Sequence, residues 1–263
     1  MSLHLSNEEN ARLTIVNYPT GYILKPQTKD YEYLPEYEDL AMRLAAIAGI
    51  QVVPHALLKI GDTFAYITKR IDRHISGDRV SMYAMEDFCQ LSNRMTYDKY
   101  RGSYEGCGRI VKKYSEYPGI DMSELFLRVL FSYVIGNSDM HLKNLSLQQT
   151  SSGDYIMTPA YDLLNTSLHI NDGDFALHDG LMPKDVHSDI YTQTGHPCRD
   201  DFAEFGRRIG VLPKKIDAII EMFAMEQPMV YELIERSFLD DRTKRMYKRS
   251  YEERLRRFQR TSK

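Results

Sequence analysis

The chain has 263 residues, of which 43% are hydrophobic and 27% charged, and its formal net charge at pH 7 is −3. These values are typical of a globular protein large enough for two lobes with hydrophobic cores. No apolar run approaches the roughly 18 residues of a membrane span, and no secretory signal is visible. Three scattered cysteines, Cys89, Cys107 and Cys198, support neither a disulfide framework nor a zinc site, so we expect a cytoplasmic protein.

Residues 1–75 are typical of a small α/β lobe. Apolar residues alternate on both sides of the polar segment 6–10, which predicts a β-hairpin, and a third strand is expected from Tyr22 to Lys25. A helix should begin near Pro35 and end at Gly49, with Leu40, Leu44 and Ile47 on its buried face. Two further strands are expected over residues 51–58 and 63–68.

From about residue 80 the apolar pattern becomes helical. The strongest helix is expected over residues 121–135, where Asp121 and Glu124 have the spacing of a capping box and the apolar residues keep a helical period. Its dense apolar face predicts a buried helix. Residues 146–149 and 154–157 then predict a short hairpin.

A polar motif follows this helix. In the segment 136–144, GNSDMHLKN, Asp139 and Asn144 lie five positions apart, and Asp162 follows in PAYD. Protein kinases use this pattern: the first Asp accepts the proton of the attacking hydroxyl, and the Asn and second Asp hold Mg²⁺ with hard oxygen ligands. The spacing alone arises by chance in a chain of this length, and a loop Asp that caps a turn is the structural alternative.

The surrounding segments make the motif more specific. In order they are YILKP at 22–26, EDLAMRLAAIAG at 38–49, KRIDR at 69–73, MEDFCQ at 85–90, KYRGSYEG at 99–106, GNSDMHLKN and PAYDLL at 159–164. This series resembles the HipA family of bacterial serine/threonine kinases, the toxin halves of HipBA-type toxin–antitoxin pairs. We therefore predict an α+β, bilobal protein-kinase-like fold, with a small β-rich N-lobe over 1–75 and a large helical C-lobe over 76–263.

The resemblance implies roles for individual residues. Asp139 is the expected general base, and Asn144 and Asp162 are the expected Mg²⁺ ligands. The remaining expected contacts are to ATP, from Lys25 with its partner carboxylate Glu38, from the connection between the lobes and from the catalytic loop and its neighbours: Lys69, Arg70, Ile71, His141, Lys143, Asn144 and Tyr161. Two structural alternatives stay open. Glu38 is an acid that is favoured simply because it lies near a helix N-terminus, and Lys143 is a solvated surface lysine.

The resemblance implies an ATP-dependent kinase that transfers a phosphoryl group from Mg-ATP to a Ser or Thr hydroxyl of a protein, as a toxin component. HipA-like kinases carry a glycine-containing phosphate loop just before the hairpin matched by residues 2–5, and this sequence begins after it. The alternative is therefore a kinase-shaped module that binds nucleotide or partners with little or no activity; a small-molecule kinase is a third possibility. A small HipS-like subunit and a helix-turn-helix antitoxin are implied as partners, with no membrane.

Two segments keep two interpretations each. Residues 242–263 hold ten Lys/Arg and two acids, which leaves 24 basic and 35 acidic residues and a net charge of −11 on residues 1–241. This tail is either a terminal helix docked through Tyr247, Tyr251, Leu255 and Phe258 or a site for DNA or another anionic partner. Residues 93–108, rich in Tyr, Gly, Lys and Arg, form either a substrate-facing loop or a turn with inward-packed tyrosines.

Overall fold

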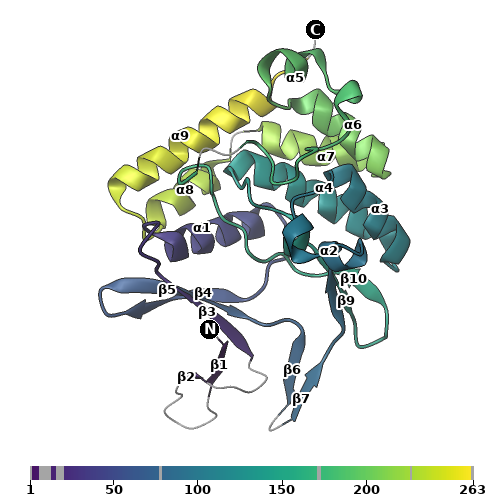
Figure 1. The fold of residues 1–263 in the computed structure, drawn as a ribbon. Coiled ribbons are helices and arrows are strands. Elements are labelled where there is room, and N and C mark those ends of the chain that lie inside the picture. Colours follow the sequence, from purple (N-terminus) through teal and green to yellow (C-terminus); the bar gives the residue numbers. More distant parts are fainter. Residues whose placement is uncertain are drawn as a thin grey trace.

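The computed structural model describes residues 2–5, 13–15, 21–76, 79–170, 173–225 and 227–261. Strands dominate the first third of the chain and helices the rest (Figure 1). Five strands form an antiparallel sheet in the order β2-β1-β3-β5-β4. Their bounds are β1 Ser2–Leu5, β2 Leu13–Ile15, β3 Tyr22–Pro26, β4 His55–Ile60 and β5 Thr63–Lys69. The predicted pairing of the first two strands is confirmed, while residues 6–12 lie outside the described residues.

Helix α1, Leu34–Ile47, crosses one face of this sheet and contacts β4 and β5 (Figure 1). Pro35 lies in its first turn, where a missing N–H is tolerated. Leu40 and Leu44 are buried as predicted, but Ile47 is 39% exposed, because it lies in the last turn of the helix. The apolar stripe therefore ends one turn earlier than its spacing indicated.

The strand expected over 51–58 begins later, at His55, because residues before it pair elsewhere. Val53 N donates to Ala160 O at 3.0 Å, and Ala160 N donates to Gln51 O at 2.7 Å. This short parallel bridge, Val52 with Ala160, joins the β-rich part to the segment that precedes Asp162.

The helical pattern expected from about residue 80 is wrong over its first residues. Strands β6, Arg73–Ser76, and β7, Arg79–Met82, form a hairpin. Strand β8, Met85–Asp87, then joins β9, Ser146–Gln149, and β10, Tyr155–Met157, in a second antiparallel sheet. For β8, pairing with a strand distant in the sequence overrides the local pattern. The β6–β7 hairpin spans the proposed boundary at residue 75, so that division stays a prediction.

The C-terminal part is built around α4, Pro118–Ile135, which is buried along most of its length. It begins earlier than predicted, and the capping box was wrong. The Asp121 carboxylate instead accepts hydrogen bonds from Ser115 Oγ at 2.6 Å and Met157 N at 2.9 Å, which ties β10 to the helix. The other helices of this part are α2 Phe88–Leu91, α3 Tyr104–Tyr114, α5 Asp189–Thr194, α6 Arg199–Ile209, α7 Pro213–Ala224, α8 Pro228–Arg236 and α9 Asp241–Phe258, with 3₁₀ turns at Thr96–Asp98, Leu142–Asn144 and Lys184–Val186.

Helix α9, the last element in Figure 1, is docked on this part of the molecule. It packs against α4, α7 and α8. Its apolar residues Tyr247, Tyr251, Leu255 and Phe258 are buried, as the docked-helix interpretation predicted. Arg254 is buried with them, whereas Arg242, Arg245, Arg249, Arg256 and Arg260 remain exposed. The tail is therefore a structural helix with one basic outer face.

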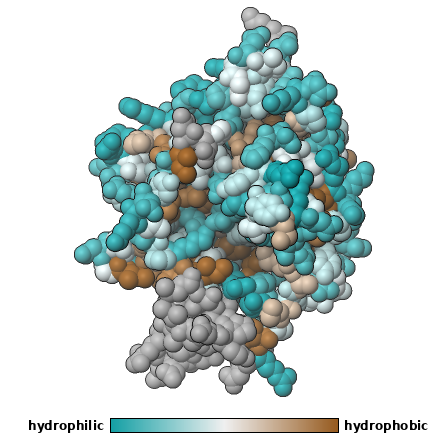
Figure 2. All heavy atoms as spheres, viewed as in Figure 1, coloured by the Kyte–Doolittle hydropathy of each residue, from teal (hydrophilic) through white to brown (hydrophobic). Residues whose placement is uncertain are grey.

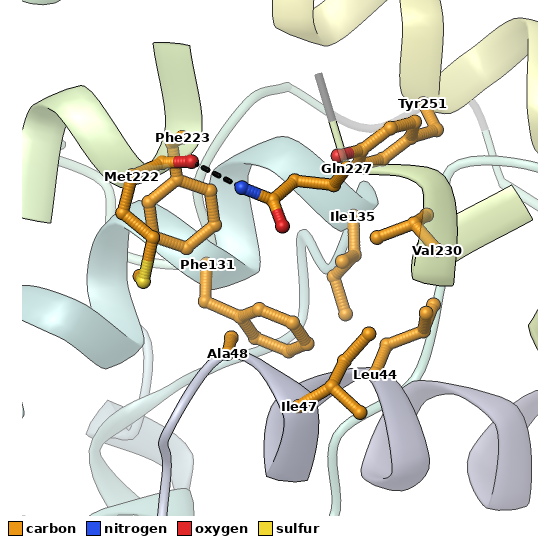
Figure 3. Close-up of a pocket in the computed structure, with 10 residues that line it drawn as sticks. All are labelled: Leu44, Ile47, Ala48, Phe131, Ile135, Met222, Phe223, Gln227, Val230 and Tyr251. Atoms are coloured by element: carbon orange, nitrogen blue, oxygen red, sulfur yellow. Dashed lines mark hydrogen bonds between the residues drawn. The ribbon is translucent and has the colours of Figure 1, made fainter. Parts of the chain in front are cut away.

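A small apolar cavity of about 40 Å³ lies where α1 meets the C-terminal helices (Figure 3). Leu44 and Ile47 of α1 point toward Phe131 and Ile135 of α4 across it. On the outer surface, hydrophilic residues cover most of the face seen in Figure 2, and hydrophobic atoms gather at the level of β4 and β5. Within the residues described, none of the helices is long and apolar enough to cross a membrane.

Candidate active site

The loop after α4 is pinned by its own polar side chains. Gly136 ends the helix with φ 79°, and a side chain there would overlap the Ser167 hydroxyl. Asn137 Oδ1 then accepts from Asp139 N at 3.1 Å, and Ser138 N donates to Thr166 Oγ1 at 2.9 Å. The sequence therefore needs both the glycine and the short polar residues to present Asp139 at a fixed position.

Asp139 is half-buried, and the hydroxyl of Tyr100 lies beside its carboxylate. Tyr100 Oη donates to Asp139 Oδ1 at 2.9 Å, and the Tyr100 ring meets the His141 ring edge-on at 5.2 Å. Burial and the neighbouring Asp139 carboxylate raise the pKa of Tyr100, so the phenol stays a donor at neutral pH. Tyr104, four residues on, is buried and donates to Met140 O at 2.8 Å. Tyr104 is thus packed inward, as one interpretation of the segment 93–108 predicted, while the substrate-facing interpretation stays a prediction.

A second cluster joins the two parts of the molecule. Lys25, on β3, places its ammonium 2.7 Å from Glu38 Oε1 of α1 and 2.5 Å from Asp162 Oδ1. Asn144 Nδ2 donates to Asp162 Oδ2 at 2.7 Å, while Asn144 Oδ1 accepts from His141 N at 3.0 Å. Four predicted site residues from distant parts of the sequence are therefore joined in one chain of contacts, Glu38 to Lys25 to Asp162 to Asn144.

The charges in this cluster differ because burial and ion pairing compete. Burial raises the pKa of Glu38 to about 7, although Lys25 opposes the rise. Burial acts in the same direction on Asp162, but the Lys25 ammonium outweighs it and the pKa of Asp162 is lowered. Burial would lower the pKa of Lys25, yet the two carboxylates outweigh it and raise that pKa. Lys25 and Asp162 are therefore both charged at neutral pH.

Asp162 also has an unusual backbone, with φ 59° in the left-handed region. Asp tolerates this region better than most residues, at a cost in energy. Its side chain is 44% exposed, so the carboxylate can be reached from solvent although both of its oxygens are bonded within the cluster. Left-handed non-glycine residues gather at functional sites.

Asn144 and Asp162 fit a Mg²⁺ ion by chemistry. Both carry oxygen donors, and Mg²⁺ is bound in proteins by one or two carboxylates together with substrate phosphates and water. The Asn144 amide would have to turn to bring its oxygen, which here accepts from His141 N, beside the Asp162 carboxylate. No group of three or more His, Cys, Asp or Glu side chains that could hold a metal occurs in the part of the chain that the structure describes. The phosphates of a nucleotide would have to complete the coordination.

A cavity of about 270 Å³ opens beside this cluster, between the five-stranded sheet and the C-terminal part. Seven predicted site residues line it: Lys25, Glu38, Lys69, Arg70, Ile71, Tyr161 and Asp162. Its other walls were not predicted; Ile23, Val53 and Met85 are apolar and Thr68 and Asp72 polar. Such a mixture of flat apolar walls and a charged end suits a nucleotide.

Three backbone groups of the segment 69–71 are already hydrogen-bonded within the protein. Lys69 N donates to Pro54 O at 2.9 Å and Arg70 N to Gly21 O at 2.7 Å. The Ile71 carbonyl accepts from Gln148 Nε2 at 2.7 Å.

Lys143 points away from the cluster. Its ammonium lies 2.6 Å from Asp87 Oδ2, at the N-cap of α2. Tyr161 is half-buried beneath the loop and donates to the Lys143 carbonyl at 3.1 Å. Lys143 and His141 are not among the residues that line the cavity. His141 is buried, which lowers its pKa and keeps it neutral at pH 7.

Comparisons with known proteins identify the family of this chain. A family model described as HipA-like C-terminal domain matches residues 6–230. A putative kinase of Haemophilus influenzae is 26% identical over 248 residues, covering 85% of this chain and 70% of the relative. The serine/threonine-protein kinase toxin HipA of Shewanella oneidensis is 31% identical over 158 residues, covering 53% of this chain and 36% of that protein.

Solved structures show the same fold. Shewanella oneidensis HipA, in complex with HipB and its operator DNA, superposes with a TM-score of 0.76 at 21% identity, covering 98% of this chain and 63% of that one. The Helicobacter pylori proinflammatory kinase CtkA superposes with a TM-score of 0.62 at 15% identity, covering 92% and 89%. The predicted bilobal kinase-like fold is thereby confirmed.

Proposed function

Because the chain belongs to the HipA-like C-terminal domain family, we propose that it is a serine/threonine protein kinase that uses Mg-ATP. One observation carries the proposal: Asp162 contacts both Lys25, at 2.5 Å, and Asn144, at 2.7 Å. These contacts lie beside a cavity with apolar walls and a charged end. Phosphoryl transfer is catalysed mainly by positioning and charge, and this cluster supplies both.

Each residue then has a definite task. Lys25 neutralises phosphate oxygens from the sheet side, with Glu38 holding its ammonium in place. Asn144 and Asp162 would hold Mg²⁺, which offsets the charge of the phosphates when bound. Asp139 accepts the proton of the protein hydroxyl as that oxygen attacks the γ-phosphorus, and ADP leaves. Asn137 keeps the Asp139 backbone in place for this step.

Partners follow from the family by analogy. The Shewanella relative was solved in complex with HipB and operator DNA, so we propose that this chain acts as a toxin restrained by a helix-turn-helix antitoxin, with DNA contacted through that partner. Co-expression with a helix-turn-helix protein encoded beside it should yield a stable complex on size-exclusion chromatography. Separate elution of the two proteins would reject this partner.

The decisive test of the chemistry is Asp139→Asn. This change keeps the size of the side chain but removes the proton acceptor, so phosphoryl transfer from radiolabelled ATP to proteins should fall by about 10²–10⁴-fold. Binding of Mg-ATP, measured by calorimetry, should stay within about twofold, since the loss concerns the transition state. Asp62→Asn, in the exposed turn between β4 and β5, is the matched control.

Residual transfer by Asp139→Asn within about threefold of the parent would remove Asp139 from the role of base. A parent chain that binds Mg-ATP and transfers nothing would be a kinase-shaped binding module instead.

A further inference from the structure

A second hollow is lined in part by Leu142 of the catalytic loop and shares no lining residue with the nucleotide cavity. It has a volume of about 380 Å³ and is bounded by α2, α3 and the loop between them. Three cations line it, Arg94, Arg109 and Lys113, against one acid, Asp179. The apolar side chains of Leu91, Ile110 and Leu142 complete its walls. Its lining is therefore positively charged, in a chain whose formal net charge is −3.

These cations are poorly neutralised by the protein itself. Arg94 Nη1 donates to the Arg101 carbonyl, and Lys113 lies 4.7 Å from the centre of the Tyr114 ring. Among the described residues, neither has a carboxylate within 4.0 Å. Arg109 is 3.9 Å from Glu105.

That Glu105 carboxylate already accepts from Arg208 at 3.0 Å, so its charge is shared between two guanidinium groups. A cation that lacks an intramolecular counter-charge gains most from an external anion. The hollow is thus suited to a negatively charged ligand.

Two glycines bring the guanidinium groups close to the backbone. Arg94 Nη1 lies 3.1 Å from the position that a Gly102 Cβ would occupy, and Arg109 Nη2 lies 3.4 Å from the corresponding position at Gly106. The first N–H groups of α3 are already bonded, Tyr104 N to Gly180 O and Gly106 N to Ser103 Oγ. The charge of the hollow therefore comes from its side chains.

One short segment, residues 99–102, contacts both the Asp139 carboxylate and the hollow. Tyr100 donates to Asp139 Oδ1 at 2.9 Å, and two residues later Gly102 lines the hollow. The catalytic loop is fastened to the same segment, since Leu142 N donates to Lys99 O at 3.1 Å. The segment 99–102 thus connects the hollow to the carboxylate that would receive the proton of a substrate hydroxyl.

We propose that Arg94, Arg109 and Lys113 form a subsite for an acidic side chain, Asp or Glu, that flanks the acceptor hydroxyl of the protein substrate. This inference rests on the proposed kinase function and specifies its substrate class. An acidic peptide fits better than nucleic acid, because nucleic acid is bound along extended basic surfaces with many phosphate contacts. The hollow instead offers three cations around apolar walls that suit the methylene groups of a side chain.

The test measures peptide binding without nucleotide, by fluorescence anisotropy at low ionic strength. The probes are fluorescein-labelled peptides with a central serine, flanked either by glutamates or by glutamines. The glutamate peptide should bind at least about fivefold more tightly to the parent chain. Lys113→Glu and Arg109→Glu should each weaken its binding about fivefold or more, because each change both removes an attraction and adds a repulsion.

Lys112→Glu is the matched control. It alters the net charge equally on the same helix, but Lys112 is exposed and does not line the hollow, so binding should change less than about twofold. Equal losses for Lys112→Glu and Lys113→Glu would overturn the subsite, as would equal binding of the two peptides. Tighter binding of a single-stranded oligonucleotide of the same charge, lost in Lys113→Glu, would overturn the choice of ligand.

A separate transfer assay keeps this test distinct from that of the proposed function. Failure of peptide discrimination while phosphoryl transfer persists would reject the subsite alone. Discrimination without any transfer would leave the subsite in place and reject the kinase assignment.

Discussion

Glu38 and Asp162 flank one ammonium group, yet their pKa values move in opposite directions. The Glu38 side chain is only 8% exposed and has one cation, so the cost of removing a carboxylate from water exceeds what Lys25 returns. Asp162 makes an additional hydrogen bond with Asn144 and is 44% exposed. The Lys25 ammonium therefore stabilises the charged form of Asp162 more effectively than that of Glu38, and Asp162 is the carboxylate that keeps its charge.

This difference predicts a pH dependence of stability. The pKa of Glu38 rises from 4.5 to about 7 on folding, so the folded protein keeps a proton that the unfolded chain releases. The contribution of Glu38 to stability is thus greatest below pH 4.5 and is lost as pH rises through about 7. In urea unfolding at pH 5 and pH 8, the parent should lose more free energy of unfolding than Glu38→Gln. Parallel pH profiles for the two proteins would contradict the raised pKa.

At the scale of elements, α9 links the C-terminal helices to α1. Tyr247 stacks on Tyr37 of α1 with ring centres 5.9 Å apart, and Phe258 meets Phe202 of α6 edge-on at 5.6 Å. Both α9 residues are fully buried. Helix α9 therefore packs against α1, the helix that carries Glu38.

Phe258→Ala should lower the free energy of unfolding by about 3–5 kcal/mol, the usual cost of deleting a fully buried aromatic side chain. Arg256→Ala, two residues away but exposed, should change it by less than about 0.5 kcal/mol. Thermal unfolding followed by circular dichroism would measure both. Equal effects of the two changes would mean that charge, and not packing, holds α9 in place.

Elements were predictable from sequence wherever one local pattern decides the structure. The spacing of Leu40 and Leu44 located α1, and the apolar period before Gly136 located the body of α4. The β8 strand was missed because its partner, β9, is distant in the sequence. The local hairpin of β6 and β7 was also missed. The start of α4 was missed although Pro118 in its first turn is a local signal. Asp121 was predicted as the cap, but its carboxylate bonds to Met157 on a distant strand.

The same distinction applies to the site. The motif spacing picked out Asn144 and Asp162, which the structure brings into contact. Tyr100 was named only within a longer segment, because nothing local shows that its hydroxyl reaches Asp139. Lys143 looked like part of the motif, but its salt bridge with Asp87 depends on how α2 packs against the loop. Roles in chemistry remain predictions for all of these residues.

At the scale of the whole molecule, few polar contacts cross the cavity. Lys25 reaches Asp162 from the sheet, and the Val52–Ala160 bridge lies two residues before Asp162. The cavity beside this cluster, the proposed nucleotide site, is lined from both sides, by Thr68 and Lys69 of the sheet and by Tyr161 and Asp162 of the C-terminal part. A ligand held by both sides should stabilise the molecule as one unit.

Mg-ATP at about 100 times its dissociation constant should add about 2.7 kcal/mol to the free energy of unfolding. For a chain of this size that corresponds to a rise in melting temperature of about 5–10 °C. Lys25→Ala, on the sheet side, and Asn144→Ala, on the loop side, should each remove most of this shift. No shift of the parent at millimolar Mg-ATP, measured by differential scanning fluorimetry, would reject nucleotide binding by this chain.

The left-handed backbone of Asp162 limits which substitutions can probe its role. Asn tolerates φ 59° about as well as Asp, whereas a residue such as Ala incurs about 1–2 kcal/mol there. Asp162→Ala would therefore change the path of the chain as well as the charge, and a lost activity could not be assigned to either. Asp162→Asn alters the charge alone and should melt closer to the parent than Asp162→Ala. Mutational tolerance at this position is thus set by backbone geometry before any ligand is bound, and an alanine scan would overstate the contribution of its carboxylate.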